Sequence, residues 1–160
     1  MTTPSAEVHA IERLQRRYAK LVDEARWHEV VLLFTEDGSL ARPSDPARPI
    51  VGRAAILQAF LERPAGAARR HLVANPEVEL IDHDNARATC ASILLVDADA
   101  GRGTVALGGF EDRLRRTAEG WRFVSRTGFT DFDPVPFTRR HASLSVSSPG
   151  HPVHPSQSQR

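Results

Sequence analysis

The chain has 160 residues, of which 41% are hydrophobic and 26% charged, and its 21 basic and 20 acidic residues give a formal net charge of +1. This length and composition are typical of one globular domain with a single core. A net charge so near zero provides no electrostatic drive toward nucleic acid or an anionic membrane. A lone cysteine, Cys90, excludes an intrachain disulfide and a cysteine-based zinc site, so a reducing, cytoplasmic location is expected.

Three helices are predicted in the first part of the chain. Thr3 and Pro4 provide an N-cap and a first-turn proline, and a stripe of apolar residues at helical spacing follows. That stripe consists of Ile11, Leu14, Tyr18, Leu21 and Val22. A second, short helix is expected from Trp27 to Phe34, so that residues 5–35 are mostly helical. A third is expected from Ala54 to Arg63, ended by Pro64.

The segment between the second and third helices is predicted to contain little regular structure. Glu36-Asp37-Gly38 indicates a turn, and a short strand is expected at residues 39–42. Pro43, Pro46 and Pro49 then predict an irregular loop that ends at Gly52.

Long strands dominate the second half of the sequence, at about 69–81, 85–97, 103–117 and 120–131. Because short turns separate them, they should form adjacent hairpins of an antiparallel sheet. His71 and Val73 share one parity, whereas Val78 and Leu80 share the other, which predicts a β-bulge near Asn75-Pro76 that bends the sheet. Residues 138–160, rich in Ser, Pro, His and Gln, are predicted to be a disordered tail after a domain at 1–137.

This arrangement resembles the nuclear transport factor 2-like superfamily, and within it the polyketide cyclase and dehydratase (SnoaL-like) branch. The residues that carry the resemblance are Arg17-Tyr18-Ala19, Val22-Asp23, Trp27, Phe34-Thr35-Glu36-Asp37-Gly38, Gly52-Arg53, Arg70-His71, Asn75 and Gly120-Trp121. The resemblance implies an α+β cone in which three N-terminal helices lie on a curved antiparallel sheet around a ligand-sized pocket.

The resemblance also implies a catalytic set. Bile-acid and scytalone dehydratases of this fold use a histidine on the first long strand, an aspartate at the end of the first helix and a nearby tyrosine. His71, Asp23 and Tyr18 occupy the matching places here. The second histidine and second tyrosine of scytalone dehydratases have no recognisable counterpart in this sequence.

Each of these residues also has a purely structural interpretation. His71 can be a strand histidine satisfied by backbone groups, Asp23 can cap the following helix, and Tyr18 can belong only to the core. A further difficulty is geometric, because Tyr18 and Asp23 lie five residues apart, on different sides of an ideal helix.

Three more residues are candidates for substrate binding. Trp27 is expected to pack or to form part of the pocket wall. Asn75 either orients a ligand oxygen from the same face as His71 or stabilises the bulge. Arg126 either binds a carboxylate or pairs with an acidic side chain.

The function that this pattern predicts is a cofactor-independent lyase, a dehydratase that uses His71 and Asp23 for acid–base chemistry. Its expected substrate is an apolar, hydroxylated and carbonyl-bearing small molecule of polycyclic or polyketide-like structure. The alternatives are an isomerase or cyclase on the same scaffold, or a non-catalytic module that binds a small ligand or resembles a dioxygenase β subunit. No metal is expected. A homodimer or higher homo-oligomer through the outer face of the sheet is expected by analogy with the fold.

Overall fold

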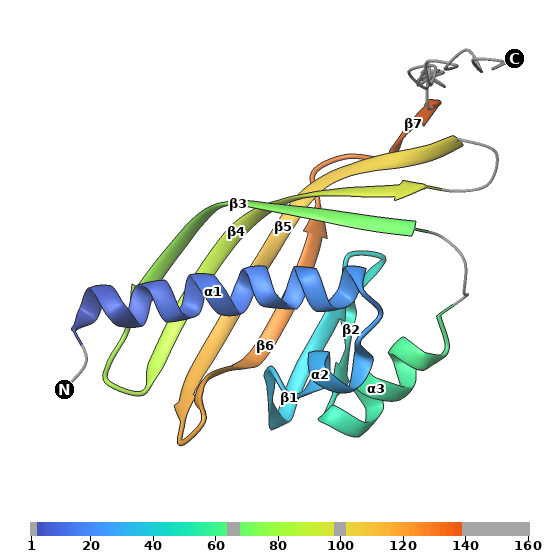
Figure 1. The fold of residues 1–160 in the computed structure, drawn as a ribbon. Coiled ribbons are helices and arrows are strands. Elements are labelled where there is room, and N and C mark those ends of the chain that lie inside the picture. The colour runs from blue at the N-terminus through green and yellow to red at the C-terminus, as the bar shows by residue number, and fades with distance from the viewer. Residues whose placement is uncertain (1–2, 64–67, 98–101, 139–160) are drawn as a thin grey trace, which may run out of the picture.

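The computed structural model describes residues 3–63, 68–97 and 102–138, which form three helices and seven strands (Figure 1). The helices are α1 (Pro4–Asp23), α2 (Trp27–Val31) and α3 (Arg53–Leu61). The strands are β1 (Phe34–Arg42), β2 (Asp45–Val51), β3 (Ala68–Leu80), β4 (Asn85–Asp97), β5 (Arg102–Thr117), β6 (Gly120–Thr130) and β7 (Val135–Thr138). The expected α+β class is confirmed.

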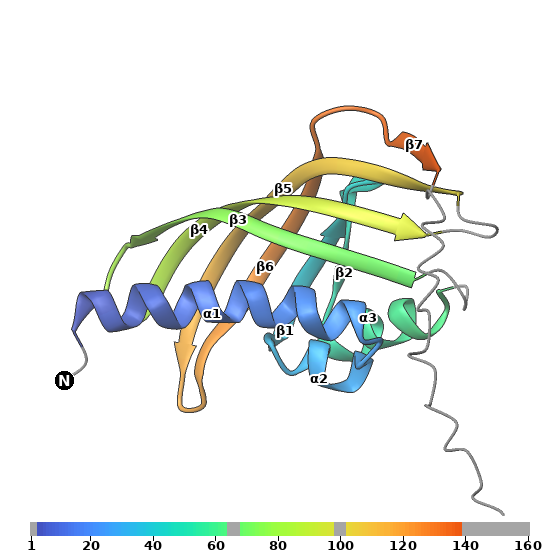
Figure 2. The same cartoon turned by 45° about the horizontal axis from the view of Figure 1, so that its top comes forward.

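All seven strands belong to one curved, open sheet. Its order is β2-β1-β6-β5-β4-β3, and β7 pairs with the beginning of β5. The four long strands β3 to β6 pair antiparallel, as predicted. By contrast β1 runs parallel to β6, so the sheet is mixed, and the prediction of an entirely antiparallel sheet is wrong at this pairing. Turning the molecule shows how the long strands bend over α1 (Figure 2).

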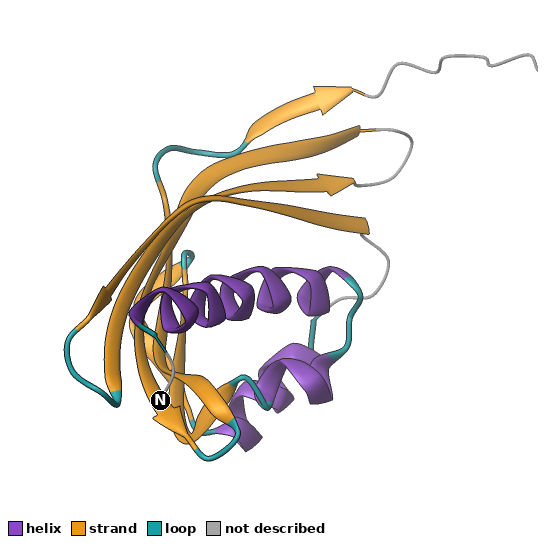
Figure 3. Cartoon of the chain, turned by 60° about the vertical axis from the view of Figure 1, so that its left-hand side comes forward, coloured by secondary structure: helices purple, strands orange, loops and turns teal. Residues whose placement is uncertain are grey.

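The long helix α1 lies along the concave side of this sheet, and α2 and α3 pack beside its C-terminal end (Figure 3). Its start is the predicted one, because the hydroxyl of Thr3 accepts a hydrogen bond from the backbone N–H of Ala6 at 3.3 Å. The apolar stripe predicted on this helix is buried along its whole length. Burial of that stripe against the sheet forms the core of the domain.

The segment between α2 and α3 departs furthest from the sequence prediction. α2 ends at Val31, and β1 runs from Phe34 through the predicted turn at residues 36–38. The predicted proline-rich loop contains β2, whose prolines are Pro46 and Pro49. They are accommodated because β2 is an edge strand, where a residue without an N–H need not break the hydrogen-bond ladder.

The predicted bulge in β3 is confirmed. The register with β4 shifts between Ala74 and Glu77, and Asn75 has a φ of +48°. This left-handed conformation is one that asparagine adopts more readily than most residues. Of the predicted tail, Thr138 is the last residue of β7, and residues 139–160 lie outside the described part of the chain.

Candidate active site

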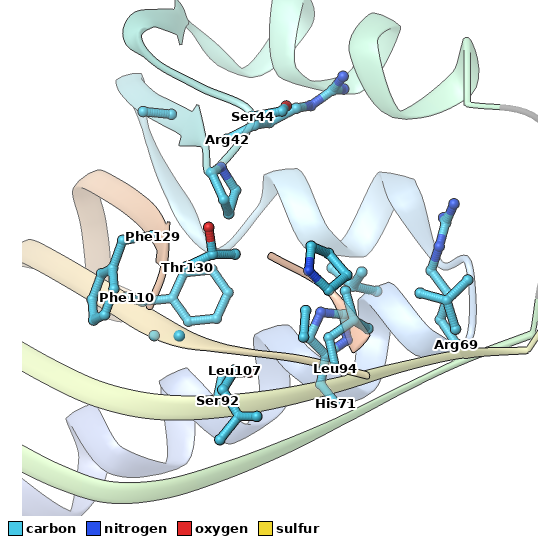
Figure 4. Close-up of a pocket in the computed structure, with 18 of the residues that line it drawn as sticks. Arg42, Ser44, Arg69, His71, Ser92, Leu94, Leu107, Phe110, Phe129 and Thr130 are labelled. Carbon is cyan, nitrogen blue, oxygen red and sulfur yellow. The ribbon is translucent and has the colours of Figure 1, made fainter. Parts of the chain in front are cut away.

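A pocket of about 490 Å³ opens between the concave face of the sheet, α1 and the end of β1 (Figure 4). Much of its wall is apolar, including Leu94, Val96, Ala106, Leu107, Phe110 and Phe129. Polar groups reach it from Tyr18, Ser44, His71, Ser92 and Thr130, and from three arginines, Arg42, Arg63 and Arg69. This size and this mixture of surfaces suit a small organic ligand.

His71 and Asp23 form a close pair at this pocket. Asp23 Oδ1 lies 2.6 Å from His71 Nδ1, and Asp23 Oδ2 accepts a hydrogen bond of 2.8 Å from the backbone N–H of His71. The two side chains are only 10% (His71) and 4% (Asp23) exposed. His71 lines the pocket, whereas Asp23 does not, so the carboxylate lies behind the imidazole ring. The two residues that the family resemblance associates are therefore in direct contact.

The position of Asp23 is not explained by helix capping. It is the last residue of α1, where the helix dipole disfavours a negative charge. The N-cap of α2 is Arg26, and no side chain caps that helix. The carboxylate instead accepts one hydrogen bond from the ring and one from the backbone of β3, an edge strand of the sheet. Its contacts are therefore with His71.

This environment determines the protonation state and the tautomer of the His71 imidazole. Burial lowers the pKa of His71 below its ordinary value, and the hydrogen bond and charge of Asp23 oppose that effect only in part. The ring is therefore neutral at neutral pH. A neutral ring that donates from Nδ1 to the carboxylate keeps an unprotonated Nε2, which can accept a proton from a ligand.

Tyr18 lines the same pocket, from α1. Its ring packs edge-on against three phenylalanines, Phe34, Phe110 and Phe123. Burial raises the pKa of its hydroxyl, so Tyr18 is a neutral hydrogen-bond donor. The five-residue spacing between Tyr18 and Asp23 is compatible with a single site, because Asp23 lies behind His71 at the helix end while Tyr18 lines the pocket.

Arg126 is not among the residues that line the pocket; it lies in the core and is fully buried. Its Nη1 donates to Asp112 Oδ2 at 2.9 Å, and the same oxygen accepts from Gln15 Nε2 at 3.0 Å. The guanidinium carbon lies 4.4 Å from the centre of the Tyr18 ring. Of the two roles considered for Arg126, pairing with an acid is the one observed. Direct substrate binding is not supported.

Asp112 and Gln15 are functional-site neighbours that the sequence pattern does not indicate. A regular hairpin continued from the pair Thr117↔Gly120 would place Asp112 opposite Ser125. A register shift between Arg113 and Leu114 moves Asp112 opposite Arg126 instead. The signal available in the sequence for this ion pair was an acidic residue in one strand and an arginine in its hairpin partner. The register shift concealed it, because regular pairing does not place the two residues opposite each other.

The two other candidates for substrate binding do not reach the pocket. Trp27 stacks on Phe60, with ring centres 4.9 Å apart and planes within 9°. It therefore contributes to packing between α2 and α3. Asn75 is exposed at the bulge, because the local register change takes it out of alternation with His71.

The described residues offer neither a candidate metal-binding cluster nor a helix that could span a membrane. No group of three or more His, Cys, Asp or Glu side chains in residues 3–63, 68–97 and 102–138 is arranged to hold a metal ion. None of the helices in those same ranges has the length and apolar character needed to cross a membrane.

The comparisons with known proteins agree with this fold. The family model of the SnoaL-like domain matches residues 4–127, and no curated protein sequence matches the chain. Three solved structures from Novosphingobium aromaticivorans are similar. An NTF2-like protein with a cystatin-like fold is 26% identical over 78% of this chain and 82% of its own, with a TM-score of 0.65.

The other two structures, less than 25% identical, show the fold alone. A provisionally named aromatic ring hydroxylase is 24% identical over 85% of this chain and 96% of its own, with a TM-score of 0.73. A provisionally named scytalone dehydratase is 20% identical over 84% of this chain and 89% of its own, with a TM-score of 0.68. The chain belongs to the SnoaL-like family of the nuclear transport factor 2-like superfamily, a family that includes polyketide cyclases and dehydratases.

Proposed function

We propose that this protein is a cofactor-independent dehydratase for a small molecule that carries a carbonyl and a β-hydroxyl group. The observation that carries the proposal is the His71–Asp23 pair, with its ring nitrogen and carboxylate oxygen 2.6 Å apart at the wall of a largely apolar pocket. Besides family membership, this pair is the feature that favours an enzyme over a module that only binds a ligand.

The first step is removal of a proton. Nε2 of His71 takes the proton from the carbon between the carbonyl and the hydroxyl-bearing carbon, and the electron pair moves onto the carbonyl oxygen. The Tyr18 hydroxyl donates a hydrogen bond to the resulting enolate. Asp23 stabilises the imidazolium, which would otherwise be a costly buried cation.

The second step is loss of water. The enolate reforms the carbonyl, a carbon–carbon double bond forms, and the carbon–oxygen bond to the hydroxyl breaks. His71 returns its proton to the departing hydroxyl, so that water leaves and the neutral imidazole is restored. If no hydroxyl is available to leave and the proton is returned to another carbon, the same groups support isomerisation or cyclisation.

His71→Ala tests the proposal, and the chain provides a matched control. His83 Nδ1 lies 2.7 Å from Asp84 Oδ1, a similar pair exposed on the surface. A panel of cyclic β-hydroxyketones is screened for loss of water by mass and for ultraviolet absorption of the conjugated product. We expect His71→Ala to lower turnover about 10²- to 10⁴-fold and His83→Ala to leave it unchanged.

Two outcomes would contradict the proposal. One is a folded His71→Ala variant that keeps the wild-type rate. The other is a wild-type protein that binds members of the panel in the pocket without converting any of them, which would favour the non-catalytic binding module.

A further inference from the structure

Three arginines line the pocket, and no acidic side chain is among its described lining residues. Arg42 ends β1, Arg63 follows α3, and Arg69 lies on β3 two residues before His71. Figure 4 shows Arg69 beside His71 on one wall and Arg42 on the wall across from it. Within the described residues, none of the three forms an ion pair with a carboxylate.

Two of these guanidinium groups are held in place by contacts that leave their charge uncompensated. Arg42 Nη2 donates to the backbone carbonyl of Ala59 at 2.5 Å, whereas its Nε is buried without a hydrogen-bond partner. The guanidinium carbon of Arg63 lies 4.4 Å from the centre of the Phe60 ring and 5.8 Å from that of Trp27. Such contacts orient the cations in advance of a ligand.

The positive charges of the three arginines also repel one another. Burial, together with the positive charges of Arg42 and Arg69, lowers the pKa of Arg63 to about 10. Arg63 therefore remains charged at neutral pH, and the pocket concentrates positive charge next to an apolar wall. An anion entering the pocket would relieve this repulsion.

We propose that the substrate carries a carboxylate, which Arg42, Arg63 and Arg69 bind so that its reacting carbons lie at His71. This deepens the proposed function by naming the substrate class, and it rests on the ligand entering the pocket that His71 faces. A carboxylate fits better than a phosphate monoester, because it is planar like the guanidinium groups and carries a single charge. A dianion is more costly to bring against the apolar remainder of the wall.

The test uses inert probes, so it does not depend on turnover. Naphthalene-2-carboxylate, naphthalene-2-carboxamide and 2-naphthyl phosphate are titrated into the full chain by calorimetry at low salt. We expect the carboxylate to bind about ten- to a hundredfold more tightly than the amide, which has the same shape without the charge. The preference should shrink as salt is added.

Variants on β3 assign the effect to the pocket. Arg69→Met should remove most of the carboxylate preference, and Arg69→Lys should keep part of it. Arg70→Met is the matched control, because Arg70 is the next residue, is exposed and does not line the pocket. Circular dichroism and melting temperature verify that each variant is folded.

The proposal is overturned if the carboxylate binds no better than the amide, if the phosphate binds more tightly than the carboxylate, or if Arg70→Met weakens binding as much as Arg69→Met. Its failure is distinguishable from failure of the proposed function. A preference for carboxylate without dehydration of any substrate refutes only the dehydratase. Dehydration of neutral substrates without that preference refutes only the carboxylate assignment.

Discussion

Replacing Asp23 by asparagine separates the proposed catalytic role of this carboxylate from a merely structural one. In the native site, one carboxylate oxygen accepts from His71 Nδ1 and the other from the His71 backbone N–H. An asparagine has only one oxygen. If its NH₂ faces the ring, Nδ1 must become an acceptor, and the proton moves to Nε2, which abolishes the base. If its NH₂ faces the backbone, two donors oppose each other.

The second arrangement has a calculable cost. A hydrogen bond to a charged group contributes about 1.5–3 kcal/mol, and this arrangement loses one of two, whereas the first keeps both without the charge. For a chain of this length about 2–4 °C of melting temperature is lost per kcal/mol, so the transition should fall by about 3–12 °C. Turnover should fall further, about 10²- to 10⁴-fold, because the amide cannot stabilise an imidazolium.

The assay compares Asp23→Asn with Glu24→Gln, the same chemical change at the next residue. Glu24 is exposed and pairs with Arg26, so its variant should retain wild-type turnover and nearly the wild-type melting temperature. Nitrogen-15 chemical shifts of the His71 ring, identified by their absence in His71→Ala, report the tautomer directly. An Asp23→Asn variant with the native tautomer and more than a tenth of the native rate would refute the reasoning.

Three further predictions concern the same molecule. First, because burial lowers the pKa of His71, kcat/KM should increase as the pH is raised, with an inflection below about pH 6.5, and stay level at neutral pH. An inflection above that pH would contradict the assignment of His71 as the base. The unfolded chain takes up this proton first, so the free energy of unfolding should decrease as the pH falls below about 6.5. Second, Tyr18→Phe should lower kcat about tenfold, less than His71→Ala, because water can replace one donor; a loss as large as that of His71→Ala would give Tyr18 a different role. Third, we expect a homodimer through the outer face of the sheet, where Leu72 and Ile93 are exposed cross-strand partners, and Leu72→Glu should shift the mass from light scattering to that of one chain. A wild-type protein already of that mass would contradict this expectation.

Local patterns in the sequence determined most of the elements. The helical spacing of the residues from Ile11 to Val22 predicted α1, and the turn residues between the long strands predicted three hairpins. The change of parity between Val73 and Val78 predicted the bulge in β3. These signals are reliable because they arise from neighbouring residues that must place apolar side chains on one side of the same element.

The pairing of His71 with Asp23 was predicted from resemblance to a family, because 48 residues separate the two in the chain. Their contact depends on the end of α1 meeting the edge of the sheet. Neither residue alone distinguishes a catalytic role from a helix cap or a satisfied strand histidine. Tertiary structure shows that the two side chains pair with each other, since it shows which acceptor each donor finds.

Three features were decided only by tertiary structure. β1 and β2 form strands despite turn residues and prolines because β6 offers β1 a partner, and pairing overrides local preference. Asp112 lies opposite Arg126 because of a one-residue register shift in the β5–β6 hairpin. Such a shift changes which residues of the two strands share a face of the sheet. The arginines at residues 42, 63 and 69 come from three separate parts of the chain and line the same pocket only in the folded structure. No local pattern encodes such a meeting, because it is fixed by packing between elements that are distant in sequence.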